Sequence, residues 1–192
     1  MSFLMSFLYH PAFQSLVLPF VLAVAISLLL RLAGLRWVAL GAALGLVLAV
    51  AVWPGFDWPA SSRVQTLPWV ALAGTLLAGL AIALKVPGTT AMDRPIGLVA
   101  TVLLTLAALA LAAWAAFGGS LLLAQLGLML GTVTGVASLW AWRGTSVSPA
   151  SLLPLLLTGI GLALCLAWLP SGGADSTGEN ASDSPYYTPR WK

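Results

Sequence analysis

Residues 120–142 read SLLLAQLGLMLGTVTGVASLWAW, and this stretch predicts how the rest of the chain is organised. In an α-helix, small residues that recur every three or four positions fall on one stripe. The stripe consists of Ala124, Gly127, Gly131, Gly135 and Ser138. Bulky residues cover the opposite side, and Leu122 among them is expected to face lipid. Because small residues let helices approach closely inside a bilayer, the stripe predicts a tight helix–helix contact.

The composition indicates an integral membrane protein. Of the 192 residues, 60% are apolar and only 7% are charged, whereas about a quarter of the residues of a soluble domain are charged. We predict an all-α membrane protein, a six-transmembrane-helix bundle with short hairpin turns and a disordered C-terminal tail. Its parts are an N-terminal interfacial segment at residues 1–12, the six-helix domain at 13–169 and the polar tail at 170–192.

Six apolar runs support this count. They cover residues 13–30, 37–53, 67–84, 95–117, 120–142 and 149–169. The second run spans only about 25 Å against a hydrocarbon core of about 30 Å, so it is short for a membrane span. Thr66 and Asp93 precede the third and fourth runs and are expected to cap those helices. Gly118 and Gly119 predict a very tight hairpin between the fourth and fifth runs.

Tryptophan residues mark the predicted membrane interface. Trp53 and Trp58 are each followed by proline, which breaks a helix, and an indole ring is best accommodated at headgroup depth. Trp69 lies at the start of the third run and is assigned to the same belt. We therefore interpret residues 54–66 as an interfacial loop.

Basic residues predict the orientation. Those that follow the first, third and fifth runs are Arg31, Arg36, Lys85, Arg94 and Arg143. Only Arg63 follows the second or fourth run, so the positive-inside rule places both termini on the non-cytoplasmic side. The composition is typical of a bacterial inner-membrane protein, and we predict that location. The basic residues form no patch that would bind nucleic acid.

Gln125 is the most distinctive polar residue within the runs. An amide in hydrocarbon needs a hydrogen-bond partner, and helical spacing places Gln125 beside Thr132 at the edge of the small-residue stripe. Two roles remain open: an interhelix hydrogen bond that serves packing, or a contact with a bound headgroup or small polar solute. Other serine and threonine hydroxyls in the runs are expected to bond to their own helix.

Catalytic chemistry has little support in the sequence. No Asp, Glu, Lys, Arg or His falls inside the six runs, whereas proton- and ion-coupled mechanisms usually need such groups at membrane depth. The only histidine, His10, precedes the first run, and the lone Cys165 cannot form an intrachain disulfide. We therefore expect no enzymatic activity, no cofactor and no metal site.

Two functions remain. The first is a non-catalytic structural or accessory subunit of a membrane assembly, with the lipid bilayer and either further copies or other membrane subunits as partners. The alternative is a small facilitator or transporter of an apolar or zwitterionic molecule, lipid included, that uses a dimer interface near Gln125. Neither function involves nucleic acid.

Overall fold

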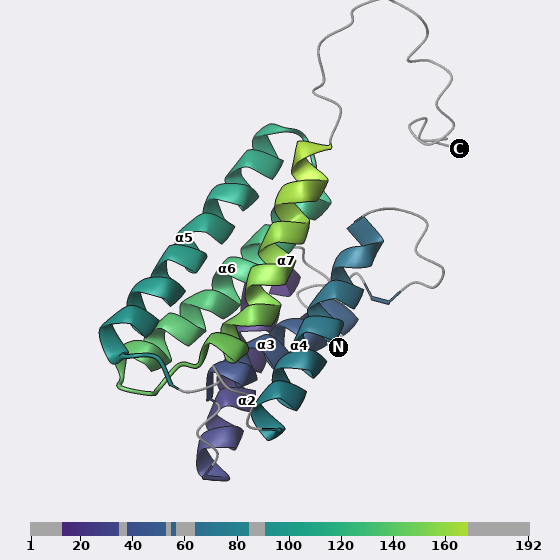
Figure 1. Cartoon of the computed structure of the whole chain (residues 1–192). Helices are drawn as coiled ribbons and strands as arrows, with labels where there is room; N and C mark the ends of the chain where they lie inside the picture. The colour runs from purple at the N-terminus through teal and green to yellow at the C-terminus, as the bar shows by residue number, and fades with distance from the viewer. Residues whose placement is uncertain (1–12, 35–37, 53–54, 57–63, 85–90, 169–192) are drawn as a thin grey trace, which may run out of the picture.

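The structure, a computed structural model, describes residues 13–34, 38–52, 55–56, 64–84 and 91–168. In chain order its elements are the π-helical turn η1 (Phe13–Val17), α2 (Leu18–Leu32), α3 (Val38–Val52), the 3-10 turn η2 (Val64–Thr66), α4 (Leu67–Ala83), α5 (Arg94–Phe117), α6 (Leu121–Trp142) and α7 (Pro149–Ala167). All regular structure in these ranges is helical (Figure 1). The all-α prediction is therefore confirmed, while the segments at 1–12 and 170–192 lie outside the described residues.

Within the described ranges, five helical segments are long and apolar enough to cross a membrane. They are Ser15–Leu32, Val64–Ala83, Arg94–Phe117, Leu121–Trp142 and Pro149–Ala167. The sixth apolar helix, α3, has 15 residues, which corresponds to a length of about 22 Å. This is shorter than the hydrocarbon core of about 30 Å. Whether α3 crosses the bilayer therefore decides between five and six spans.

The helices pack most extensively as three antiparallel pairs, α5 with α6, α2 with α3, and α4 with α7 (Figure 1). The first two pairs are sequential hairpins, whereas α4 and α7 come from distant parts of the chain. Gly119, at φ 76°, allows the chain to reverse between α5 and α6. The tight hairpin predicted at Gly118 and Gly119 is thus confirmed.

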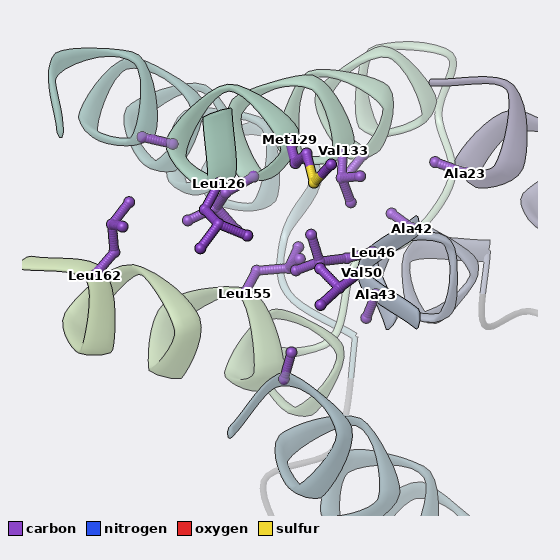
Figure 2. Packing of buried hydrophobic residues seen from close by; sticks show 14 of the residues in the cluster. Ala23, Ala42, Ala43, Leu46, Val50, Leu126, Met129, Val133, Leu155 and Leu162 are labelled. Atoms are coloured by element: carbon purple, nitrogen blue, oxygen red, sulfur yellow. The ribbon is translucent and has the colours of Figure 1, made fainter. Parts of the chain in front are cut away.

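Helix α6 is the centre of the bundle. It contacts α2, α3, α5 and α7, and 67% of the residues in its most apolar part are buried. Figure 2 shows side chains of α6, α3 and α7 meeting in one hydrophobic core. Met129 of α6 and Leu155 of α7 are both fully buried there, and Leu46 of α3 is 2% exposed. The bundle is therefore built around the helix that carries the small-residue stripe.

The predicted helix caps need correction. Thr66 belongs to the turn η2, has a helical backbone and makes no side-chain capping hydrogen bond. Thr66 and Asp93 both occupy the predicted N-cap positions, of α4 and α5, but the Asp93 side chain also makes no capping bond. A proline in the first turn of each helix already removes one of the amide donors that a cap would satisfy. Only α7 has a side-chain cap among the described helix starts: the backbone N–H of Ser151 donates to the hydroxyl oxygen of Ser148 at 3.2 Å.

Candidate functional site

The glycines of the α6 stripe face α5. A β-carbon built on Gly127 would lie 2.9 Å from the backbone Cα of Ala112, and one on Gly131 would meet the tip of a leucine side chain at 2.9 Å. At Gly135 the nearest atom is the Cγ2 of Thr105, at 3.8 Å. The helices therefore approach most closely at Gly127 and are less crowded at Gly135.

Ala124 and Ser138 lie at the two ends of this stripe. Ala124 is buried at 6% exposure. The Ser138 hydroxyl lies 3.2 Å from the Thr105 hydroxyl of α5, and it also donates to the carbonyl of Thr134 at 3.0 Å. The Thr105 hydroxyl donates to the carbonyl of Thr101 at 2.8 Å. Because each hydroxyl has a single proton, the contact between the helices competes with these backbone bonds.

The bulky side of α6 also packs inside the bundle. Val133 is fully buried and Val136 is 2% exposed. Leu122, which we expected to face lipid, is half-buried. The reason is that α6 has helices on both sides, since α3 and α7 cover the face that α5 does not. A small-residue stripe on one side therefore did not imply lipid on the other.

Sequence analysis missed a second pair of glycines, in α3. A β-carbon on Gly45 would lie 2.6 Å from the Cα of Ala23, and one on Gly41 would lie 2.8 Å from the Cα of Ser27. These backbone approaches between α2 and α3 are closer than the approach at Gly127. The spacing of four residues in GAALG was the signal that could have revealed this contact.

Gln125 is buried at 8% exposure, and the structure draws no hydrogen bond from its amide to another described residue. The hydroxyl of Thr132 donates to the carbonyl of Leu128 at 2.8 Å, so it is already used within its own helix. Thr75 likewise donates to Ala71 at 2.7 Å, which confirms the expectation for this type of hydroxyl. Both roles foreseen for Gln125 remain predictions.

The predicted interfacial belt is described only in part. Trp69 is half-buried and packs edge-on against Phe56, with ring centroids 5.1 Å apart. Trp53 and Trp58 lie outside the described residues. The belt as a whole therefore stays a prediction.

Three arginines from different elements gather at one end of the bundle. Arg31 lies near the end of α2, and its guanidinium carbon is 5.3 Å from the ring centroid of Trp140 in α6. Arg94, the first residue of α5, donates to the carbonyl of Trp142 at 2.8 Å. Arg143 directly follows α6. These residues belong to the set expected on one side of the membrane, of which Arg36 and Lys85 lie outside the described part of the chain.

A groove of about 180 Å³ lies at this end, between α2 and α6. Its lining consists of Val24, Leu28, Leu139, Trp140 and Arg143. The Trp140 side chain is 9% exposed, and its indole nitrogen is buried without a hydrogen-bond partner in the described structure. A buried donor without a partner costs about 1 to 3 kcal/mol, so the indole N–H of Trp140 lowers the stability of the fold.

No group of three or more His, Cys, Asp or Glu side chains within the described ranges is arranged to hold a metal ion. The expected lack of a cofactor and of enzymatic activity remains a prediction. Comparisons with family models, with curated proteins and with solved structures each found no match to this chain. The function is therefore inferred from the geometry of the chain itself.

Proposed function

We propose that the protein is a six-span membrane bundle that acts as a non-catalytic structural or accessory subunit of a membrane assembly. The supporting observation is the close packing of its described helices. Glycines admit neighbouring helices at contact distance, and the void between α3, α4, α6 and α7 measures only about 10 Å³. That is about the space of one water molecule. A closely packed bundle suits a subunit that holds partners in place.

The outer face of α5 is the surface we assign to a partner. Val99, Leu103 and Leu106 are exposed by 56%, 60% and 58%, and only 22% of the residues in the most apolar part of α5 are buried. Such a face can pack against a second copy or another subunit as readily as against lipid, because all three are apolar. Most of the burial of α5 comes from its contact with α6, which leaves this outer face available.

Co-purification from native membranes tests the subunit role. We expect a stoichiometric membrane partner to be retained in mild detergent. Replacing Leu103 and Leu106 by alanine should reduce its yield, because these side chains lie outside the core. The matched control replaces Leu76 and Leu80, exposed by 65% and 55% on α4. A chain that purifies without a partner or further copies would contradict the proposal, as would equal losses in both double variants.

The proposal includes six crossings of a bacterial inner membrane, with both termini outside the cytoplasm. The common position of Arg31, Arg94 and Arg143 at one bundle end supports this orientation, because basic residues favour the cytoplasmic side. Flanking residues must extend α3 across the bilayer, or the bilayer must thin locally.

Reporter fusions test this topology. A reporter after Ala60 and one at the C-terminus should be external, whereas reporters after Gly88 and Gly144 should be cytoplasmic. A cytoplasmic signal after Ala60 would show that α3 does not cross, and the number of spans would then be five.

The alternative, a facilitator or transporter for an apolar or zwitterionic molecule, is favoured by Gln125. Gln125 is 8% exposed and its amide forms no hydrogen bond with another described residue, so a bound solute or a dimer contact could provide a partner. Gln125→Leu separates the two functions. The subunit role predicts unchanged partner recovery, whereas the transport role predicts loss of a co-purified solute from a dimer of this chain.

A further inference from the structure

We infer that the groove between α2 and α6 binds an anionic phospholipid, with Arg31 and Arg143 holding its phosphate and one acyl chain lying along the groove. The site is formed by two helices that the fold brings together from distant parts of the sequence. It goes beyond the proposed subunit role and shares with the proposed function only the orientation in the membrane.

Along each helix the groove changes from apolar residues to an arginine, as a lipid changes from acyl chain to phosphate. On α2, Val24 and Leu28 are four residues apart and Arg31 follows three residues later, so the three lie on one face of the helix. On α6, Leu139 is followed four residues later by Arg143. Both helices thus run from an apolar wall to an arginine at the same bundle end. This arrangement places an acyl chain toward the membrane and a phosphate at its surface.

The two guanidinium groups are available for a ligand. Arg31 has its guanidinium carbon 5.3 Å from the Trp140 ring centroid, a cation–π contact, and the N–H groups of this guanidinium donate to no acceptor among the described residues. Neither Arg31 nor Arg143 forms an ion pair with a described acidic residue, and both are exposed. Arg94 differs, because it is bonded to the Trp142 carbonyl. A planar guanidinium donates paired hydrogen bonds that fit phosphate oxygens.

The apolar walls favour a lipid over a free phosphate ion. Leu28 and Leu139 are exposed by 45% and 42%, and an acyl chain would cover them, whereas an inorganic ion would not. The predicted orientation places this end at the cytoplasmic leaflet, which is the leaflet with the anionic surface. The simpler role, in which both arginines only complement the negative ends of their helices, predicts no preference among lipids.

Lipid titration followed by native mass spectrometry tests the inference on the purified full chain in a neutral detergent. The probes are phosphatidylglycerol and phosphatidylcholine with the same acyl chains. Phosphatidylcholine carries the same phosphate, but its choline cation offsets that charge. Each arginine near a net anionic headgroup contributes about a fivefold gain in affinity, so phosphatidylglycerol should bind roughly twentyfold more tightly than phosphatidylcholine. Inorganic phosphate at the same concentration should not displace it. Equal binding of the two lipids, or displacement by phosphate, would overturn the inference.

Substitutions test whether the preference for phosphatidylglycerol arises in the groove. Arg31→Gln and Arg143→Gln should each weaken phosphatidylglycerol binding about fivefold, and the double variant should bind both lipids alike. Arg94→Gln removes the same charge at the same end and should keep the preference. Leu28→Trp fills the groove while keeping both arginines, and it should weaken binding of phosphatidylglycerol.

Circular dichroism and gel filtration check that each variant is folded. If the double variant does not fold, the single variants and Leu28→Trp still decide the outcome. An undiminished preference in these variants, or an equal loss in Arg94→Gln, would refute a specific lipid site.

Discussion

Gly127→Ala and Gly135→Ala make the same chemical change on one face of α6, yet the structure predicts opposite effects on stability. At Gly127 the added β-carbon would lie 2.9 Å from the Cα and 3.0 Å from the backbone nitrogen of Ala112. Backbone atoms cannot rotate away, so α5 and α6 must separate. At Gly135 the nearest atom would be 3.8 Å away, which is an ordinary contact. The methyl group therefore fits at one position and not at the other.

The magnitudes follow from two opposing effects. Replacing glycine by alanine inside a helix is worth about 0.5 to 1 kcal/mol, because alanine loses less backbone freedom on folding. Overpacking against a fixed backbone costs about 1 to 3 kcal/mol. We expect Gly127→Ala to lower the free energy of unfolding by about 1 kcal/mol and Gly135→Ala to raise it by about 0.5 kcal/mol. Gly131→Ala should fall between them, because it meets only the flexible end of Leu109.

Unfolding by sodium dodecyl sulfate in mixed micelles, followed by far-ultraviolet circular dichroism, measures these differences. Gel filtration of the same samples separates loss of folding from loss of assembly. If Gly127→Ala is as stable as Gly135→Ala, the close approach of α5 and α6 is not present in the membrane-like environment. The small-residue stripe would then have lost its role in packing.

Three other substitutions test the remaining contacts by the same unfolding measurement. Gly45→Ala should be at least as destabilising as Gly127→Ala, because its β-carbon would lie 2.6 Å from the backbone of α2; a neutral result would contradict the α2–α3 contact. Arg94→Gln removes the hydrogen bond to the Trp142 carbonyl and should cost about 1 kcal/mol, with Arg94→Lys recovering part of it. Ser138→Ala should cost about 0.5 kcal/mol or less, and a larger loss would show that its interhelix bond outweighs its backbone bond.

Local rules predicted several features that the structure confirms. The Gly118–Gly119 hairpin follows from the conformational freedom of glycine at a reversal. The hydroxyl bonds of Thr75 and Thr101 to their own helices follow from the need of a hydroxyl in an apolar setting for an acceptor. Each of these features depends on residues within a few positions of one another. Sequence alone was sufficient for them.

The arrangement of the helices was harder to predict. In a soluble protein the polar face of a helix marks its exposed side, but here lipid and a neighbouring helix are equally apolar. Met129 and Leu103 are both large and apolar, yet Met129 is fully buried and Leu103 is 60% exposed. Only small residues mark the contacts, and the pair Gly41 and Gly45 was overlooked because α3 is short and uniformly apolar.

The arginines at one end of the bundle also show what the sequence alone cannot predict. Their number indicates the orientation in the membrane, but their individual contacts come only from the structure. The positive-inside rule gives Arg31, Arg94 and Arg143 equal weight, because it depends only on charge near a helix end. The structure distinguishes them by their neighbours: Arg94 is bonded to a backbone carbonyl, whereas Arg31 lies over the Trp140 ring. A guanidinium bonded to a carbonyl holds two elements together, and one that lies over a ring keeps its N–H groups for a ligand. Charge counting can therefore predict the side of the membrane, but only tertiary contacts separate an arginine that stabilises the fold from one that can bind a phosphate.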